Sequence, residues 1–264
     1  MNFLIQTING KIVHDFSFEL ERSIEYQMWR GREDISAAYC ELEQLSRLDF
    51  GVDSDAIRDY IPVGTVEFVT KFCKLYINPN AEQSIKPINI PEEMSSLLGR
   101  WVCNMEIKDG KPSISLPSRF FIKSNDRLKY PLNGIHSVDD LEKFDNGSYQ
   151  VSDVLDDIQA EYRIIVYKDE ILGIQFYSGD PEVFPNRTDI HNLMAVWNWN
   201  YGSGKAPVAH TLDVMVTEDG TFPIECHDFF SCGLYGFSDY NKLPFMFSQT
   251  FHRLKERLIT LQYN

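Results

Sequence analysis

The stretch His210–Gly236, HTLDVMVTEDGTFPIECHDFFSCGLYG, predicts two short β-strands joined by a tight turn and followed by a glycine-rich loop. Apolar and polar residues alternate over 211–217, and this period of two is typical of a strand with one buried face. Residues 218–220, Glu-Asp-Gly, are typical of a turn, because glycine adopts a positive φ without strain. The stretch is therefore expected to be a β-hairpin.

The two acidic residues of this hairpin are expected to face each other. If Thr217 pairs with Thr221 across the turn, Asp213 falls opposite Glu225. Both then lie on the face of the hairpin opposite to the apolar side chains. Like charges directly opposite on neighbouring strands destabilise a sheet unless something neutralises them. A divalent cation would do so, since Mg²⁺ commonly takes one or two carboxylates together with substrate phosphates. The alternative is an edge hairpin with a solvated acidic face.

Composition and charge limit the class of protein. The 264 residues, 43% of them hydrophobic, suffice for one large domain or two modest ones. No run approaches the ~20 apolar residues of a membrane span, the start of the chain is not a secretory signal, and five scattered cysteines favour a reducing, cytoplasmic setting. The net charge of −14 argues against a broad nucleic-acid surface. We therefore expect no nucleic-acid or membrane partner. A monomer or a homodimer is the expected state, although no sequence feature determines it.

The first third of the chain predicts a small α/β unit. Its expected elements are strands over 1–7 and 59–65, a helix over 34–48, and a helix that Thr65 caps and that ends near Tyr76. Residues 78–91, rich in proline and asparagine, are the best candidate linker. The expected domains are thus an N-terminal α/β domain, 1–85, and a second domain, 86–264.

The rest of the chain predicts mainly antiparallel strands. Its other expected elements are a short helix over 91–98, strands over 100–107 and 118–123, a short helix over 137–144 with Ser137 as cap, a strand over 149–155, a hairpin over 161–177, a helix over 189–199 with Asp189 as cap, and a helix over 239–262. This order indicates the α+β class and not a parallel doubly wound sheet. Neither GxxxxGK(S/T) nor GxGxxG occurs, so the two commonest nucleotide-binding signatures are absent.

Five pieces of the second domain occur in a recognisable order. They are FFIK at 120–123, the loop residues Lys129 and Gly134, QVSDVLDD at 150–157, EYRIIV at 161–166, and D-(x)11-E-x-H-D-(x)4-G-x-Y-G at 213–236. This ordered set resembles the ATP-grasp superfamily, and more closely the bacterial and phage clade named for two arginines and a lysine. The resemblance covers about residues 86–247, and the first third of the chain fits the α/β domain that precedes the ATP-grasp domain in this family.

The resemblance implies a fold and an activity. The fold is an α+β ATP-grasp fold, in which two α+β subdomains clasp ATP, after a small α/β N-terminal domain. Its members use ATP and Mg²⁺ to convert a carboxylate into an acylphosphate, which an amine then attacks. The expected protein is therefore a carboxylate–amine ligase of the peptide type that releases ADP and phosphate, with a small molecule, an amino acid or a peptide as substrate.

The resemblance also implies a nucleotide site. Lys123 at a strand end and Lys129 in the covering loop would neutralise the phosphates of ATP. The backbone of 151–154 would bind adenine, and Asp156 or Asp157 would bind the ribose. The residues implied in nucleotide binding are Lys123, Lys129, Val151, Asp153, Val154, Asp156 and Glu161. The alternative for both lysines is a solvated surface position.

Arg163 is the implied catalytic residue, together with Lys129. It shares a strand face with Glu161, and a guanidinium suits the spread charge of an acylphosphate transition state. The alternative for Glu161 and Arg163 is a surface ion pair worth about 0–1 kcal/mol. Arg119 and Arg187 compete for the role of the second arginine.

Asp213, Glu225 and His227 are the implied metal site, and here the sequence departs from the family. The usual motif ends in E-x-N, whereas this chain has Glu225-Cys226-His227-Asp228. A neutral imidazole is a poor ligand for Mg²⁺. His227 therefore contributes only a hydrogen bond, or Asp228 supplies the oxygen ligand, or the metal preference moves toward Mn²⁺. The remaining alternative is that His227 is an ordinary structural histidine.

Three functions remain open at this point. The first is the ATP- and Mg²⁺-dependent ligase. The second is a catalytically inactive binding or interaction module on an ATP-grasp scaffold, which the histidine at position 227 suggests. The third is a metal-dependent hydrolase that uses Asp213, Glu225, His227 and Asp228, although the sequence has no second cluster of histidines with ligand spacing.

Overall fold

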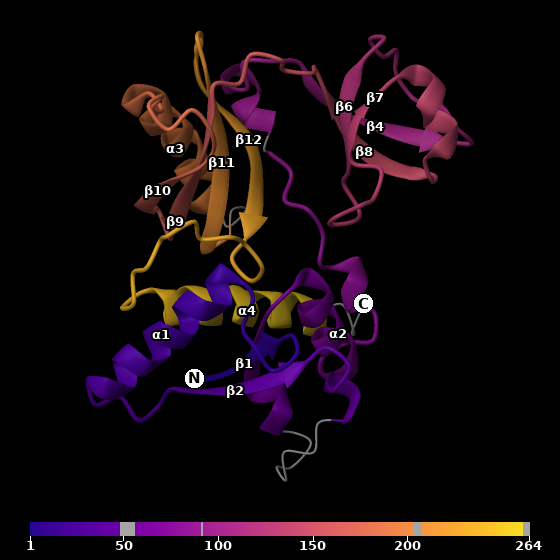
Figure 1. The fold of residues 1–264 in the computed structure, drawn as a ribbon. Coiled ribbons are helices and arrows are strands. Elements are labelled where there is room, and N and C mark those ends of the chain that lie inside the picture. The colour runs from indigo at the N-terminus through magenta and orange to yellow at the C-terminus, as the bar shows by residue number, and fades with distance from the viewer. Residues whose placement is uncertain (48–55, 91, 203–206, 261–264) are drawn as a thin grey trace.

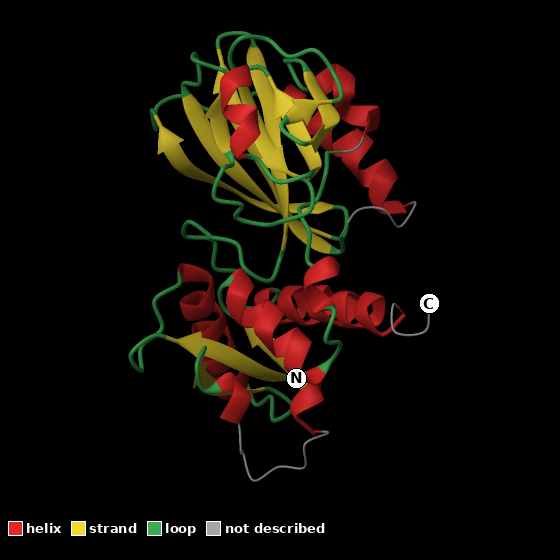
Figure 2. Cartoon of the chain, turned by 90° about the vertical axis from the view of Figure 1, so that its right-hand side faces the viewer, coloured by secondary structure: helices red, strands yellow, loops and turns green. Residues whose placement is uncertain are grey.

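The computed structural model describes residues 1–47, 56–90, 92–202 and 207–260, and within these ranges the strands form three sheets. A three-stranded parallel sheet lies with its helices in one half of the molecule, and two antiparallel sheets make up the other half (Figure 1). Figure 2 shows the same division from the side, with most helices below and most strands above. The α+β class predicted from the sequence is confirmed.

The parallel sheet forms the N-terminal unit. Its strand order is β2-β1-β3, with β1 at Asn2–Thr7, β2 at Ser36–Glu41 and β3 at Tyr60–Val63. Helix α1 (Asp15–Trp29) follows β1, and helix α2 (Val66–Tyr76) follows β3. The predicted cap of α2 is confirmed, because Oγ1 of Thr65 accepts a hydrogen bond of 3.1 Å from the backbone N–H of Phe68.

The helix predicted over 34–48 is wrong, because Ser36–Glu41 forms the strand β2. This strand pairs in parallel with the whole of β1, from Ser36 opposite Asn2 to Glu41 opposite Thr7. Strand β1 is almost entirely buried, so a complete ladder with it fixes the backbone of β2. Long-range pairing of this kind overrides a local helical preference.

The last helix, α4 (Leu243–Thr260), packs with the N-terminal unit (Figure 1). Its buried residues share one hydrophobic core with β1, α1 and α2. The ring of Phe251 meets the edge of Phe72 at 6.1 Å, and Nδ2 of Asn78 donates a hydrogen bond of 2.7 Å to the carbonyl of Leu258. The boundary between 85 and 86 stays a prediction. The helix predicted at 239–262 is present as α4, but it begins at Leu243, and residues 261–262 lie outside the described part of the chain. The helix lies in the core of the first unit.

The smaller antiparallel sheet follows the linker. Its strand order is β5-β4-β8-β6-β7, with β4 at Val102–Lys108, β5 at Lys111–Pro112, β6 at Phe120–Ser124, β7 at Gly134–His136 and β8 at Gly147–Ser152. Two short 3-10 helices, η4 (Glu92–Leu97) and η5 (Val138–Lys143), replace the short helices predicted over 91–98 and 137–144. The cap predicted at Ser137 is confirmed, and Asp140 completes a capping box with it.

The larger antiparallel sheet has the order β10-β9-β11-β12, with β9 at Ala160–Tyr167, β10 at Glu170–Gly179, β11 at Ala209–Thr217 and β12 at Gly220–Asp228. Helix α3 (Arg187–Gly202) covers one face of it, over a core that includes Trp197 and Leu212. Asp189 is not the cap of α3. The side chain of Asn186 accepts the first N–H groups, and Asp189 accepts the N–H of Thr221 at 3.0 Å instead. Among the described residues, no helix combines the length and apolar character needed to cross a membrane.

The register of the β11–β12 hairpin contains a bulge. Thr217 lies opposite Gly220, so the predicted pairing of Thr217 with Thr221 is wrong by one residue. The bulge lies between Val214, opposite Pro223, and Asp213, opposite Glu225. Ile224 is thus the extra residue, and it restores the predicted pairing of Asp213 with Glu225. The other face of the sheet is packed under α3, so both acidic residues lie on the face opposite to α3.

Candidate active site

A cavity of about 300 Å³ lies between the two antiparallel sheets. Strands β6 and β8 line it on one side, and β9, β11 and β12 line it on the other. Its apolar wall includes Phe121, Ile135, Val154, Leu155, Ile158, Met215 and Ile224. Its polar groups are Arg100, Lys123, Gln150, Ser152, Asp153, Glu161 and Glu225. An apolar concavity with a few convergent polar groups is typical of a ligand site.

Lys123 and Glu225 connect the two sheets across this cavity. Nζ of Lys123, on β6, lies 3.8 Å from Oε2 of Glu225, on β12. The Lys123 side chain is only 13% exposed, and burial lowers its pKa while the charge of Glu225 opposes this effect. A solvated surface position, the alternative for Lys123, is therefore excluded.

Arg100 is a cavity residue that the sequence analysis missed. Its Nη1 donates hydrogen bonds to the carbonyls of Leu98 (3.1 Å) and Pro223 (2.8 Å). Burial lowers its pKa, and no carboxylate of the described residues forms an ion pair with it. The charge of Arg100 also lowers the pKa of Lys123, after the larger effect of burial. Two partly buried cations thus share one cavity, which favours an anionic ligand.

Neither of the two arginines predicted to compete for the second position lies in this cavity. Arg119 is exposed and forms an ion pair of 2.9 Å with Asp156. Arg187 begins α3, and its Nε lies 3.4 Å from Nε2 of His191. The arginine that lines the cavity is Arg100. It directly precedes the strands of the smaller sheet, but only the fold places it beside Lys123.

The residues predicted to bind adenine lie at the end of β8. Val151 is fully buried in the core of the smaller sheet and pairs with both Ile122 and Cys103, so its side chain does not line the cavity. Asp153 lines the cavity, and its carboxylate accepts the N–H of Trp101 at 3.0 Å. Val154 also lines it. The part of the predicted segment that meets the cavity therefore runs from Ser152, the last residue of β8, to Val154.

Lys129 lies away from the cavity and near the N-terminal unit. It is exposed, has a φ of 53°, and belongs to the loop between β6 and β7. Its neighbour Leu128 packs against the N-terminal core. Burial and, second, the charge of Lys129 lower the pKa of His14, which precedes α1. The loop that contains Lys129 thus reaches the N-terminal unit. Asp156, which is exposed and pairs with Arg119, also lies outside the cavity.

Arg163 and Asp213 form a buried ion pair between β9 and β11. Nε and Nη2 of Arg163 each lie 2.7 Å from one carboxylate oxygen of Asp213. Arg163 is 6% exposed and Asp213 2%, so the two alternatives, a solvated acidic face at Asp213 and a surface ion pair of Glu161 with Arg163, are both excluded. Burial lowers the pKa of Arg163, but the hydrogen bonds and charge of Asp213 outweigh this effect and raise it.

The same guanidinium holds the glycine-rich loop after β12. Nη1 of Arg163 donates a hydrogen bond of 3.0 Å to the carbonyl of Gly233, and the guanidinium carbon lies 5.1 Å from the ring of Tyr235. Tyr235 stacks on Tyr177, whose hydroxyl donates to Glu161 at 2.7 Å. Arg163 therefore connects the acidic centre to the loop.

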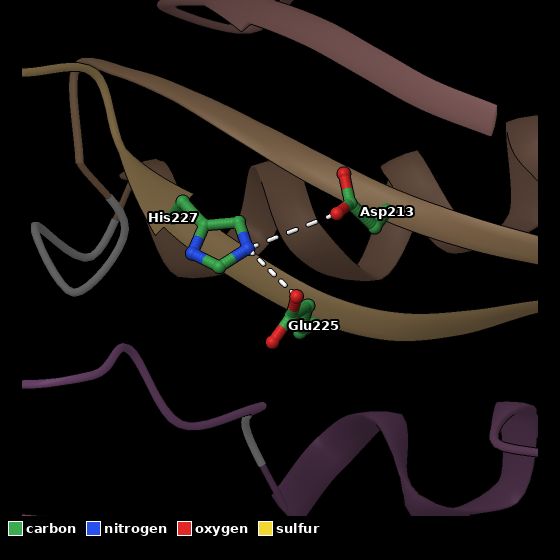
Figure 3. Close-up of side chains that lie close together, drawn as sticks. All are labelled: Asp213, Glu225 and His227. Atoms are coloured by element: carbon green, nitrogen blue, oxygen red, sulfur yellow. Dashed lines mark ion pairs between the residues drawn. The ribbon is translucent and has the colours of Figure 1, made fainter. Parts of the chain in front are cut away.

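Asp213, Glu225 and His227 converge on one point (Figure 3). Nε2 of His227 lies 2.9 Å from Oε1 of Glu225 and 3.7 Å from Oδ2 of Asp213. Burial disfavours the charge of His227, but the two carboxylates outweigh it and raise its pKa to about 9. Burial likewise raises the pKa of Glu225, but His227 and other cations lower it to about 2. Side-chain cations thus already balance the two carboxylates.

The donor atoms of this cluster fit a divalent cation. The predicted ligands are together, and the ligand atoms of all three lie within 4.8 Å of one another. Asp213 keeps free lone pairs on its oxygens beside the two bonds from Arg163. The alternative oxygen donor, Asp228, lies 3.7 Å from Arg257 of α4 and is outside the cluster. A proton and a metal ion compete for Nε2 of His227, since only a neutral imidazole binds metal.

Comparison with known proteins agrees with this architecture. The model of the ATP-grasp domain of the R-two-K clade, family 2, matches residues 97–243. D-cycloserine synthetase DcsG has a similar structure (TM-score 0.57, 12% identity, 98% of this chain and 100% of that chain covered). So does N5-carboxyaminoimidazole ribonucleotide synthetase from Thermotoga maritima (TM-score 0.50, 11% identity, 94% and 75% covered).

At these identities the two structures show the fold alone, and no curated protein sequence matches the chain. The family model covers more than half of the chain. It includes the cavity, the ion pair and the cluster of Asp213, Glu225 and His227. The chain therefore belongs to the ATP-grasp superfamily, in family 2 of the R-two-K clade.

Proposed function

We propose that this chain is an ATP- and Mg²⁺-dependent carboxylate–amine ligase that acts through an acylphosphate. The observation that supports this most directly is the cavity between the two sheets. Two partly buried cations, Lys123 and Arg100, line it together with Glu225, which belongs to the cluster of Asp213, Glu225 and His227. A triphosphate would neutralise the cations and supply the remaining oxygen ligands of a divalent ion.

The nucleotide would be bound by groups from both sheets. Lys123 and Arg100 would hold phosphate oxygens, because both line the cavity and, within the described part of the chain, the hydrogen bonds of Arg100 go to carbonyl groups and not to a carboxylate. The apolar residues Val154 and Met215 would exclude water from the base. Glu225 and Asp213 would hold the cation through oxygen atoms, and the bound cation would supply positive charge to the phosphates.

The reaction would proceed in two transfers. A carboxylate oxygen of the substrate attacks the γ-phosphorus of ATP, and ADP leaves. An amine then attacks the acyl carbon, loses a proton, and inorganic phosphate leaves. Arg163 and Lys129 stay the proposed catalytic residues. Arg163 would act from its place beside Asp213 and Gly233, and Lys129 from its loop at the N-terminal unit. A small molecule, an amino acid or a peptide would be the substrate, and five unpaired cysteines favour the cytoplasm.

Nucleotide binding tests this proposal first. ATP with Mg²⁺ should raise the melting temperature, since a ligand at 100 times its Kd stabilises by about 2.7 kcal/mol. Lys123→Met and Arg100→Met should each weaken ATP binding at least about tenfold, which is the effect of losing one charge-assisted contact of roughly 1.5–3 kcal/mol. Lys108→Met, an exposed lysine of the same sheet, is the matched control and should bind ATP normally.

Turnover tests the proposal second. ADP and phosphate should appear only when both a carboxylate and an amine are supplied from a panel of amino acids and peptides. No thermal shift at millimolar ATP would contradict the proposed site. Binding without ADP release across the panel would favour the inactive binding module, and hydrolysis of a substrate without ATP would favour the metal-dependent hydrolase.

A further inference from the structure

The position of His227 bears on which metal ion the cluster selects. Strand alternation places Glu225 and His227 on the same face of β12, and Asp213 lies directly opposite Glu225 on β11. The imidazole is therefore brought into the cluster by the strand itself, and Figure 3 shows its Nε2 directed at both carboxylates. The side chain is 29% exposed, so an ion in the solvent can reach it.

The distances in the cluster are those of atoms that share an ion. Two ligands bound at about 2.1 Å from one ion stand at most about 4.2 Å apart, and neighbouring ligands of an octahedron about 3 Å apart. Nε2 of His227 lies 2.9 Å from Oε1 of Glu225 and 3.7 Å from Oδ2 of Asp213. Both separations are inside this limit, and all three ligand atoms lie within 4.8 Å of one another, so an ion can contact all three once the side chains shift toward it.

The donor set is mixed, with two carboxylate oxygens and one imidazole nitrogen. Mg²⁺ selects oxygen donors and near-ideal octahedral geometry, whereas the affinity of a site with nitrogen donors rises along the first-row transition-metal ions. The nitrogen therefore adds to the affinity for a transition-metal ion more than to that for Mg²⁺.

The charges around the cluster limit how well any ion binds alone. Arg163 already pairs with Asp213, and Lys123 lies 3.8 Å from Glu225. The two carboxylates thus offer little net negative charge, and the phosphates of a nucleotide would supply the rest. Nucleotide should therefore tighten ion binding.

We propose that this site takes a first-row transition-metal dication, such as Mn²⁺, in preference to Mg²⁺, with Nε2 of His227 as a direct ligand. The proposal rests on the proposed function in one respect, that the cluster is the metal site of the nucleotide centre. It does not require the ligase reaction to occur.

Pulsed electron paramagnetic resonance of bound Mn²⁺ tests the proposal, because a directly bound nitrogen modulates the echo. The sample is the whole chain with Mn²⁺, first alone and then with a non-hydrolysable ATP analogue. We expect ¹⁴N modulation from one imidazole, which changes to the ¹⁵N pattern when the protein is labelled with ¹⁵N-histidine. The label separates the protein ligand from the nitrogens of adenine.

His227→Asn is the decisive variant, because asparagine offers an oxygen at the same place. It should lose the nitrogen modulation and lower the ratio of Mn²⁺ to Mg²⁺ affinity at least about tenfold, measured by competition with Mg²⁺ and corresponding to about 1.4 kcal/mol. His191→Asn, an exposed histidine on α3, is the matched control and should change neither. Circular dichroism melting identifies a variant that fails to fold, and then His227→Gln replaces it.

The outcomes separate this proposal from the ligase proposal. Absence of ¹⁴N modulation in the wild type, absence of Mn²⁺ binding, or an unchanged affinity ratio in His227→Asn overturns the metal assignment, even if ADP is formed with Mg²⁺. Nitrogen-bound Mn²⁺ in a protein that forms no ADP with any substrate upholds the metal assignment and counts against the ligase.

Discussion

Replacing Arg163 with methionine should destabilise the protein strongly, because it leaves the carboxylate of Asp213 buried without its partner. Arg163 provides both 2.7 Å contacts to that carboxylate, which is 2% exposed. Breaking a buried pair by removing one partner costs about 3–5 kcal/mol, and the lost hydrogen bond to Gly233 adds about 1 kcal/mol. His227, 3.7 Å from Asp213, offsets part of this. We therefore expect a net loss of about 4 kcal/mol in the free energy of unfolding, measured by urea denaturation.

A second substitution, Asp213→Asn, should change stability in opposite directions in the wild type and in Arg163→Met. Asp213→Asn alone should destabilise the protein, because it leaves the buried guanidinium of Arg163 without its ion-pair partner. In the Arg163→Met background the same substitution should restore about 2 kcal/mol of the free energy of unfolding, because it removes the unpaired buried carboxylate. Arg119→Met is the matched control, because Arg119 makes a comparably short but exposed pair with Asp156, and it should change stability by at most about 1 kcal/mol. A loss below about 1 kcal/mol in Arg163→Met, or a further loss on adding Asp213→Asn, would refute the reasoning.

Two further predictions concern stability. His210 is fully buried, its Nε2 accepts the indole N–H of Trp197 and its Nδ1 lies 3.0 Å from the carbonyl of Pro207, so burial lowers its pKa to about 4. Below the ordinary pKa of about 6.5 the unfolded chain binds the proton that the folded chain rejects, so stability falls from about pH 6.5 down to about pH 4. Between pH 7.5 and 5.0 the wild type should lose about 2 kcal/mol more than His210→Gln in urea melts, and equal losses would contradict the assignment. Thr65→Ala should cost about 1 kcal/mol in the same assay, because it leaves the N–H of Phe68 at the start of α2 without its cap, while Thr65→Ser should retain most of the stability.

Local patterns were sufficient for the elements that depend on neighbours in sequence. The hairpin at 210–228, the cap at Thr65 and the capping box at Ser137 all follow from residues a few positions apart. The pairing of Asp213 with Glu225 was predicted correctly from a turn register that is wrong by one residue. The bulge at Ile224 compensates for that error. It follows Pro223, which has no N–H to give to the ladder, and this was the available signal.

Contacts between distant segments could not be predicted in this way. Residues 36–41 form a strand because they pair with β1, and no pattern within residues 34–48 indicates that pairing. The pair of Arg163 with Asp213 depends on β9 lying beside β11, which sequence alternation alone does not state. Arg100 reaches the carbonyl of Pro223, 123 positions along the chain. The chemistry of the candidate site was therefore foreseeable by residue type, but its charge balance and its second cavity cation were not.

The packing of α4 into the N-terminal core has a consequence for folding. Residues of β1, α1 and α2 share their core with Phe247, Phe251 and Leu258, so contacts that complete the first unit span almost the whole chain. On the ribosome the parallel sheet emerges early but lacks one of its covering helices until residues 243–260 have been made. Such long-range closure slows folding and leaves apolar surface exposed in the meantime. The two antiparallel sheets lie between these segments in sequence, so they can fold first and bring α4 back to the unit whose core it completes.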